Sequence, residues 1–398
     1  MIDIVYIDPN TLMLDSFKLG KKIYKSGFIP THAISLWRGG TPVGLGVGEY
    51  FRLKGHYILH TTIATASYTG INSQNEVIIK GLEHLIKVIS REDKLLIIDD
   101  VYDSGRTIMT ILKAIKNMAR ANTPLEIKIA CLYNKLNNHS FQCETISLTE
   151  IVDKNKWLSY PHEISDLVFD DDPNELLLKA KSKRIYEIIS KTDKFEHQKI
   201  DSKDKLYISP NDLLEDSLKL AGIMFSDNYI PDFLIAIWPR GVNVGLPIHE
   251  YFKYKIKKNK IDISYPDHIS INTTNSDSSY KSNVIGIKYL EDNINFDDKI
   301  LLIDSVFYTG RLINDAIDEL RAILKRNINI ENIKIATVYY KPNSDVTWTK
   351  MATYKAPHFY LKEINNDIVL PQDVHKLSNP EVELVKLNPE LKEIIYSS

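Results

Sequence analysis

The strongest constraint on the fold is an internal sequence repeat with a period of about half the chain. Residues 5–52 match residues 206–253 without gaps at 20 of 48 positions, where chance would give about three. Two further matched blocks follow at slightly larger offsets. A period of about 200 residues is far too long for a solenoid, so a whole domain is duplicated. We therefore expect two related domains, one over residues 1–195 and one over residues 196–398.

Each copy alternates short apolar runs with helical patterns. In the first copy, strand-like runs occupy residues 33–36, 94–98 and 127–132, and a helical pattern occupies residues 107–118. Short, continuous apolar strands separated by helices predict a parallel sheet covered on both faces. The expected fold class is therefore α/β in both copies. Between them, residues 174–205 predict an amphipathic helix and a polar linker, which we interpret as a solvated connection.

Charge and cysteine content exclude several classes of function. The 50 Lys+Arg against 52 Asp+Glu leave a net charge of -2, so no bulk field recruits nucleic acid or an anionic membrane. The two cysteines, Cys131 and Cys143, form neither a disulfide framework nor a zinc motif. The chain begins with acid where a secretory signal carries positive charge, and no apolar stretch is long enough to span a membrane. We expect a cytoplasmic protein without a membrane or nucleic-acid partner.

The most informative segment leads from an apolar strand into a helix. The strand ends in Asp99 and Asp100, and a short loop with Ser104 and Gly105 reaches Thr107 at the start of the helix. Backbone N–H groups at a helix N-terminus bind phosphate, and glycine lets the backbone come close to it. Carboxylates at the carboxyl end of a parallel strand lie where such folds place ligands. The segment therefore predicts a site for a phosphorylated sugar.

This segment resembles the signature of the type I phosphoribosyltransferases, which bind phosphoribosyl pyrophosphate (PRPP). That signature is four apolar residues, two acids and a loop ending in Thr/Ser-Gly-x-Thr, and every one of these positions is filled here. The resemblance implies two tandem domains of this type, each with a parallel-sheet α/β core and a small hood. The PRPP-binding residues that it implies are Asp99, Asp100, Ser104, Gly105, Arg106, Thr107, Arg38 and Gly39, the last two in a segment that resembles the family's pyrophosphate loop.

Other positions of the first copy resemble the 6-oxopurine enzymes of this family. Asp103 stands where a carboxylate beside purine N7 can accept a proton and make N9 a better nucleophile. Lys135 stands where a lysine donates to the purine O6, which would reject adenine. Trp157 would stack on the base, and Leu158 would offer backbone groups to its 2-position edge.

The same resemblance implies a mobile lid and a metal. Ser67 and Tyr68 resemble the Ser-Tyr pair of a loop that closes over the site and excludes water from an oxocarbenium-like transition state. Mg²⁺ would bridge the diphosphate and the ribose hydroxyls, with Asp99, Asp100 and Glu163 on the metal side.

The implied activity is that of a purine salvage enzyme, a pentosyl transferase of nucleotide metabolism. It would transfer the 5-phosphoribosyl group of PRPP to N9 of hypoxanthine, guanine or xanthine and release diphosphate. Because type I enzymes commonly work as dimers, the fused copies could form an intramolecular pseudo-dimer, or the chain could form a homo-oligomer. An alternative from another class is a non-catalytic or regulatory protein that binds PRPP or nucleotides.

The second copy keeps the loop but loses three of its chemical positions. Ser305 replaces the second acid, Tyr308 replaces the Asp beside the base, and Leu312 replaces the closing Thr. The counterpart of Trp157 is Asp367. We therefore expect this copy to keep the fold and to turn over PRPP poorly or not at all.

Overall fold

The chain divides into two compact units, which are Met1–Leu158 with Pro371–Ser398, and Ser159–Leu370. The computed structural model describes residues 3–67, 77–136, 144–151, 153, 156–169, 172, 174–191, 194–274, 283–285, 287–342 and 356–397. The two units do not coincide with the two sequence copies. The first unit includes the end of the second copy, and the second unit includes the end of the first copy. The domain boundary near residue 195 remains a prediction about the repeat.

The first unit is built on a six-stranded sheet with the order β4-β3-β2-β5-β6-β7. Its strands are β2 (His32–Trp37), β3 (Leu59–Ser67), β4 (Val77–Lys80), β5 (Lys94–Tyr102), β6 (Glu126–Lys135) and β7 (Thr145–Ile151). Neighbouring strands are parallel except β3 and β4. Every residue of β2 is buried, as a strand covered on both faces requires. The predicted α/β class is confirmed.

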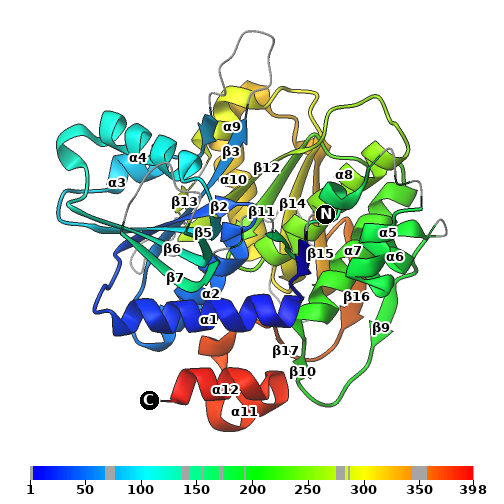
Figure 1. The fold of residues 1–398 in the computed structure, drawn as a ribbon. Coiled ribbons are helices and arrows are strands. Elements are labelled where there is room, and N and C mark those ends of the chain that lie inside the picture. The colour runs from blue at the N-terminus through cyan, green and yellow to red at the C-terminus, as the bar shows by residue number, and fades with distance from the viewer. Residues whose placement is uncertain are drawn as a thin grey trace. The chain divides into compact units, whose positions relative to one another are not determined.

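Helices cover both faces of this sheet (Figure 1). On one face lie α1 (Pro9–Lys25) and α2 (Gly40–Leu53), and on the other lie α3 (Glu83–Val88) and α4 (Arg106–Ala119). Asp8 caps α1, since its carboxylate accepts hydrogen bonds from the backbone N–H groups of Asn10 and Thr11. The C-terminal segment packs against α1 and α2 and contains a short 3₁₀ turn (Val374–Lys376), α11 (Pro380–Leu387) and α12 (Pro389–Tyr396).

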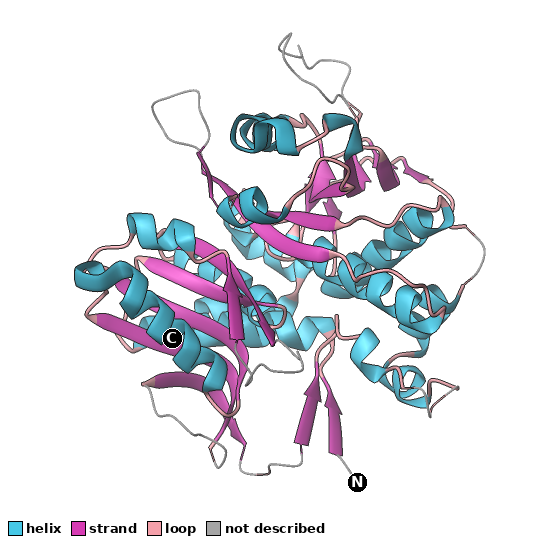
Figure 2. Cartoon of the chain, turned by 90° about the horizontal axis from the view of Figure 1, so that it is seen from above, coloured by secondary structure: helices cyan, strands magenta, loops and turns pink. Residues whose placement is uncertain are grey.

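The second unit contains a seven-stranded sheet with the order β13-β12-β11-β14-β15-β16-β9. Its strands are β9 (Gln198–Ile200), β11 (Phe233–Trp238), β12 (Asp267–Thr274), β13 (Asn283–Ile285), β14 (Ile300–Phe307), β15 (Ile333–Tyr340) and β16 (Phe359–Ile364). Its main helices are α7 (Pro210–Ser226), α8 (Val242–Lys258), α9 (Lys288–Asn293) and α10 (Arg311–Leu324). Apart from the added β9, the strand order repeats that of the first sheet, as a duplicated domain would produce. Figure 2 shows the strands and the covering helices of both units.

Two small sheets lie apart from the large ones. In the first, β1 (Asp3–Tyr6) pairs with β8 (Lys156–Ser159), and in the second, β10 (Leu206–Tyr207) pairs with β17 (Ile368–Val369). Each therefore joins the start of one sequence copy to a strand near the end of the same copy. The chain passes into the other unit at Ser159, the last residue of β8, and at Pro371, shortly after β17.

The segment between the copies contains the predicted amphipathic helix, but its apolar face is buried in the second unit rather than forming part of a solvated connection. It forms α5 (Leu176–Lys181) and α6 (Lys183–Ser190), which belong to the second unit, as does the preceding 3₁₀ turn (Ser165–Leu167). Leu178, Ile185, Ile188 and Ile189 are buried. The apolar face of an amphipathic helix is stabilised by burial, and here α6 packs on α7.

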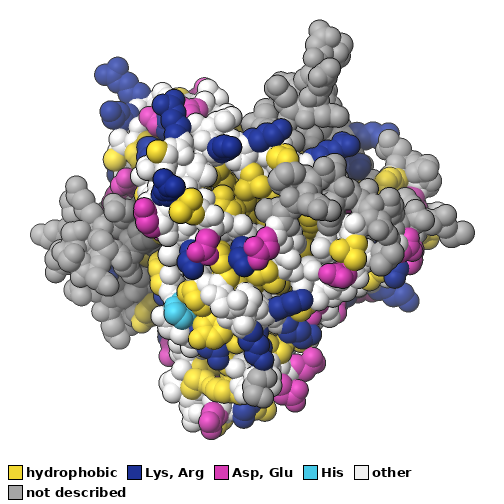
Figure 3. Space-filling view, turned by 60° about the vertical axis from the view of Figure 1, so that its left-hand side comes forward, with side chains coloured by type: hydrophobic (Ala, Val, Ile, Leu, Met, Phe, Trp, Pro, Cys, Tyr) yellow, Lys and Arg dark blue, Asp and Glu magenta, His cyan; other side chains and the backbone are white. Residues whose placement is uncertain are grey.

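No helix among the described residues is both long and apolar enough to cross a bilayer. On the face drawn in Figure 3, the Lys and Arg side chains of the described residues are interspersed with Asp and Glu side chains.

Candidate functional site

The β5–α4 loop places the two predicted acids at the carboxyl end of a central strand. Asp99 and Asp100 lie near the end of β5, and α4 begins at Arg106. Gly105, just before the helix, has φ of 76°, a left-handed conformation that favours glycine. The Ser104 hydroxyl accepts a hydrogen bond from the Arg106 N–H at 3.4 Å. Thr107 is the second residue of α4. This arrangement leaves the N–H groups of the first helical turn facing the loop.

The two adjacent carboxylates are partly buried and accept hydrogen bonds from the backbone. Asp99 accepts the backbone N–H of Asp100 at 3.0 Å, and Asp100 accepts that of Val101 at 2.8 Å. Burial raises the pKa of both carboxyls although each keeps some exposed surface, and the charge of Asp100 raises the pKa of Asp99 further. The Arg38 guanidinium partly offsets the rise in the pKa of Asp100. A bound cation would relieve this unfavourable pairing.

The donor chemistry of this pair fits Mg²⁺. Magnesium prefers hard oxygen ligands and is usually held by one or two carboxylates together with substrate phosphates and water. Within the described part of the chain, no cluster of three or more His, Cys, Asp or Glu could hold a metal by itself. Glu163, the third predicted metal-side residue, belongs to the second unit, where its carboxylate accepts the Tyr160 N–H at 2.9 Å. Its role at a metal remains a prediction.

The loop between β2 and α2 runs directly over Asp100. A Cβ atom added to Gly39 would lie 2.0 Å from Asp100 Oδ2, so the loop can pass this close only where no side chain exists. The Arg38 carbonyl accepts a hydrogen bond from the Thr41 hydroxyl at 2.6 Å. The Trp37–Arg38 peptide bond is cis. The structure therefore brings Arg38 and Gly39 together with the carboxylate pair.

The two polar residues predicted on the base side are also brought together. Lys135, the last residue of β6, places its Nζ 3.2 Å from Asp103 Oδ2. The Lys135 side chain is 15% exposed and that of Asp103 is 45% exposed, so the lysine is mostly buried while the carboxylate is accessible to solvent. This ion pair was not among the sequence predictions, because the two residues lie on different elements.

The structure gives less information on the other residues predicted to bind the base or form the lid. Trp157 is half-buried and Leu158 is buried, both in β8. Ser67 is the last residue of β3, and Tyr68 lies outside the described residues. The roles of these four residues in base binding and closure remain predictions.

In the second copy, residues at the corresponding positions of the two loops contact one another. Arg240 stands where the first copy has Gly39, and its Nη2 lies 3.3 Å from Asp304 Oδ2. Ser305, the counterpart of Asp100, donates its hydroxyl to the Arg240 carbonyl at 2.5 Å. In the first copy, a side chain at position 39 would overlap the Asp100 carboxylate. Ser305 is shorter than Asp, so the second copy can carry Arg240 there, and the two replacements depend on each other. Comparing the copies position by position at both loops could have found this signal.

The base side of the second copy is filled in a similar way. Lys341, the counterpart of Lys135, lies 3.0 Å from Asp367 Oδ1 and 5.1 Å from the centre of the Tyr308 ring. Asp367 stands at the position of Trp157 and Tyr308 at that of Asp103. The counterpart of Lys135 therefore contacts the counterparts of both Asp103 and Trp157, which supports a common location for Asp103, Lys135 and Trp157 in the first copy.

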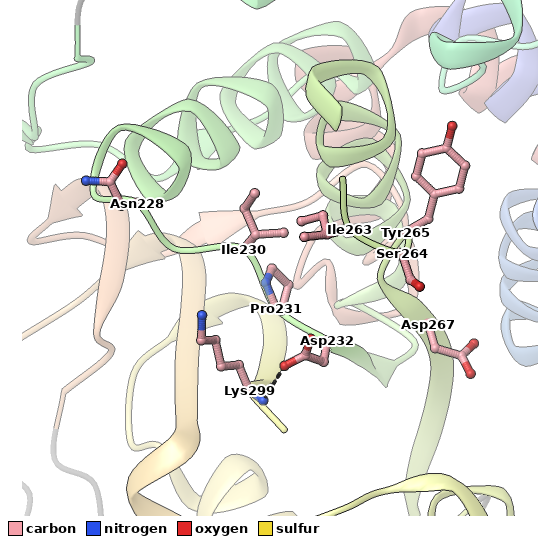
Figure 4. Close-up of a pocket in the computed structure, with 9 residues that line it drawn as sticks. All are labelled: Asn228, Ile230, Pro231, Asp232, Ile263, Ser264, Tyr265, Asp267 and Lys299. Carbon is pink, nitrogen blue, oxygen red and sulfur yellow. Dashed lines mark hydrogen bonds between the residues drawn. The ribbon is translucent and has the colours of Figure 1, made fainter. Parts of the chain in front are cut away.

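A cavity of about 530 Å³ in the second unit lies elsewhere (Figure 4). Among its lining residues, Asp232 and Lys299 directly precede β11 and β14, and Asp267 begins β12. The Lys299 N–H donates to the Asp232 carboxylate at 2.8 Å. The cavity is thus at the amino ends of the strands, whereas the loop after Asp304 is at their carboxyl ends. It is not the counterpart of the candidate site.

Comparison with protein-family models and with curated proteins finds no match. Solved structures do match. A purine phosphoribosyltransferase from Pyrococcus horikoshii OT3 is 22% identical at a TM-score of 0.31, over 40% of this chain and 93% of its own. A xanthine-guanine-hypoxanthine phosphoribosyltransferase from Helicobacter pylori is 20% identical with a TM-score of 0.31, and the match covers 39% of this chain and 92% of that one. A Neisseria gonorrhoeae protein with bound ppGpp is 19% identical with a TM-score of 0.35, and the match covers 45% of this chain and 98% of that one. This chain is similar to each over less than half its length, and at these identities and TM-scores the likeness says nothing of its activity.

Proposed function

We propose that the first copy is a phosphoribosyltransferase that transfers the 5-phosphoribosyl group of PRPP to N9 of a 6-oxopurine. The observation that carries this proposal is the Asp103–Lys135 pair at 3.2 Å. Asp99 and Asp100 lie near the end of β5, Asp103 follows in the loop to α4, and Lys135 ends the neighbouring parallel strand β6. The carboxyl ends of two adjacent strands would thus offer a sugar and metal end beside a base end, as joining a base to a phosphorylated sugar requires.

At the sugar end, each group has a distinct task. The N–H groups at the start of α4, with the Ser104 and Thr107 hydroxyls, would bind the 5-phosphate. Asp99 and Asp100 would accept hydrogen bonds from the ribose hydroxyls and hold Mg²⁺, which when bound neutralises the charge developing on diphosphate. Arg38 and the Gly39 backbone would hold that diphosphate as it leaves.

At the base end, the purine would replace the ion pair between Asp103 and Lys135 with its own contacts to each side chain. Lys135 donates to O6 and Asp103 accepts the N7 proton, so the purine N9 becomes the better nucleophile. The N9–C1 bond forms as the C1–O bond breaks, and the electron pair of that bond leaves with diphosphate. Adenine offers an amino group in place of O6, which would leave the mostly buried Lys135 without an acceptor. Such a reaction would belong to purine salvage, in the cytoplasm.

The deciding experiment measures diphosphate release by the full chain from PRPP and Mg²⁺, with hypoxanthine, guanine, xanthine, adenine, orotate and uracil tested in parallel. We expect release with at least one 6-oxopurine and none above the no-base control with adenine, orotate or uracil. Release with adenine instead would remove Lys135 from its assigned role. PRPP binding without release for any base would favour the regulatory alternative.

A second test addresses the loop over Asp100. In Gly39→Ala, the new Cβ would overlap the Asp100 carboxylate, so the loop must move and PRPP affinity should fall by about tenfold or more. The matched control is Gly48→Ala in α2, whose Cβ would approach nothing closer than 3.3 Å, at His60. Titration calorimetry with PRPP and Mg²⁺ measures both. Equal affinities for the two variants would show that this loop does not bind the diphosphate.

A further inference from the structure

The first turn of α2 lies directly against the sheet of the first unit. A Cβ atom added to Gly40 would lie 2.5 Å from the Ile98 carbonyl oxygen and 3.0 Å from the Asp99 Cα. One turn later, a Cβ atom added to Gly44 would lie 1.8 Å from the Ser35 Oγ. No side chain fits at either position, so the helix can approach the strands this closely only through glycine. Its distance from the sheet is therefore set by what lies beneath these two glycines.

A hydrogen-bonded pair of side chains lies beneath Gly44. The Ser35 Oγ on β2 lies 3.0 Å from the His60 Nε2 on the neighbouring strand β3, and both side chains are buried. Burial also lowers the pKa of His60 to about 3, so the ring is uncharged at neutral pH. A buried hydrogen bond is costly to break, because its polar atoms would lose this partner away from water. The Ser35–His60 pair therefore supports the helix in one position.

The opposite side of α2 is held by α1. A Cβ atom added to Gly46 would lie 2.4 Å from the Ser16 Cβ on α1. The Ser16 hydroxyl is directed to its own helix, where it donates to the Leu12 carbonyl at 2.6 Å. The helix α2 is thus packed closely between α1 and the Ser35–His60 pair. Because protein interiors leave few voids, removing a group that supports the helix would allow the helix to shift.

The second copy keeps these glycines but not the polar pair. Gly241 and Gly245 stand at the positions of Gly40 and Gly44. The strand residue beneath them is Ala236 in place of Ser35, and its Cβ lies 3.1 Å from where a Cβ atom of Gly245 would be. The copy that has lost the second acid has therefore also lost this hydroxyl, and its helix shows that alanine is tolerated at this position.

We propose that Ser35 and His60 are positioning residues for the diphosphate end of the first copy's site. They set the distance of α2 from the sheet, and thereby the distance between the loop that precedes α2 and the Asp100 carboxylate. That loop has little freedom, since a Cβ atom at Gly39 would lie 2.0 Å from Asp100 Oδ2, and a misplacement of about 1 Å can lower a rate about a hundredfold. The proposal rests on the proposed function, and every contact that it uses lies within the first unit.

The test compares Ser35→Ala with Ser16→Ala in the full chain, because both remove one buried hydroxyl beside a glycine of α2. For Ser35→Ala we expect the KM for PRPP to rise about tenfold, with the KM for the purine base within about twofold of wild type. Ser16→Ala keeps the Cβ that contacts α2 and should leave both constants within about twofold. An unchanged KM for PRPP in Ser35→Ala, or an equal rise in Ser16→Ala, would overturn the proposal.

Variants of the histidine provide a rescue and a second route to the same result. His60→Gln can place an amide near the position of Nε2 and should keep the KM for PRPP within about threefold of wild type, whereas His60→Leu should raise it about as much as Ser35→Ala. The double variant Ser35→Ala/His60→Leu should raise it no further, because both changes remove the same hydrogen bond. Full additivity of the two effects would refute their action as a pair.

Hydrogen exchange tests the position of the helix independently of activity. The Thr41 N–H donates to the Arg38 carbonyl at 3.3 Å, and its exchange should accelerate in Ser35→Ala and not in Ser16→Ala. A wild-type chain that neither binds PRPP nor reacts with any base would refute the proposed function, and the positioning role with it. Unchanged exchange in Ser35→Ala, in a chain whose wild type is active, would refute the positioning role alone.

Discussion

Asp103→Asn is expected to lower turnover with hypoxanthine or guanine by roughly 10²–10⁴, the usual contribution of a general base. Asn keeps the size of the side chain and one accepting oxygen, but it cannot take the N7 proton. It also leaves the Lys135 ammonium, 3.2 Å away in the wild-type chain, without a charged partner. PRPP affinity should change little, because the sugar-side groups are untouched. Initial rates with saturating PRPP and titration calorimetry separate the two effects.

The matched control for this variant is Tyr308→Phe. Tyr308 occupies the equivalent position of the second copy, and its side chain is 44% exposed. If catalysis belongs to the first copy alone, this change should leave turnover within about twofold of wild type. Full activity in Asp103→Asn would remove Asp103 from the role of general base, and a large loss in Tyr308→Phe would assign catalysis to the second copy.

Deleting residues 371–398 is expected to unfold the first unit while leaving the second unit folded. The deleted segment contributes six buried apolar side chains, which are Val374, Leu377, Leu384, Leu387, Leu391 and Ile395. Burial of one such side chain stabilises a protein by about 1.5–3 kcal/mol, with area-based values as upper estimates. The loss is therefore on the order of 10 kcal/mol, comparable to the whole stability of a domain. Calorimetric unfolding should lose one of its transitions.

A pair of point variants on α11 gives the controlled form of this prediction. Leu384 is completely buried, and Leu384→Ala should lower the free energy of unfolding of the first unit by about 2–5 kcal/mol. Val385, the next residue, is 48% exposed, and Val385→Ala should cost no more than about 0.5 kcal/mol. A truncated chain that unfolds like the wild type would show that the C-terminal segment does not complete the first unit.

The same reasoning applies to a fragment made of residues 1–195. Such a fragment would contain the whole first copy and lack the C-terminal segment that covers α1 and α2. We expect it to be unstable for that reason, independently of any catalytic role of the second copy. Supplying residues 371–398 as a fused tail should restore its folding.

Local features of the fold were predictable because they depend on residues close in sequence. The apolar runs at 33–36, 94–98 and 127–132 coincide with β2, β5 and β6, and the helical pattern at 107–118 lies within α4. Their ends differ by a few residues, as is usual for element boundaries. The turn at Gly105 was also accessible, since a left-handed residue before a helix favours glycine.

The segment between the copies was predicted only in part. The helical spacing of its apolar residues predicted the amphipathic helix that forms, but its charge suggested a solvated connection, whereas these apolar residues are buried in the second unit. Periodicity was a better guide than charge, because it shows that one face of the helix requires cover. What covers that face could not be derived, since α7 is distant in sequence.

The sequence by itself determined the internal repeat, the α/β class and the residue types offered by the β5–α4 loop, because repeat spacing, apolar periodicity and turn residues can all be seen in the sequence. Only the tertiary structure decided that Asp103 pairs with Lys135, that Arg240 pairs with Asp304, and which copy's chain completes which unit. The ends of the two copies occupy equivalent places in the repeat, so either end could complete either unit. The choice between such equivalent partners depends on packing across the whole chain, which no local pattern contains.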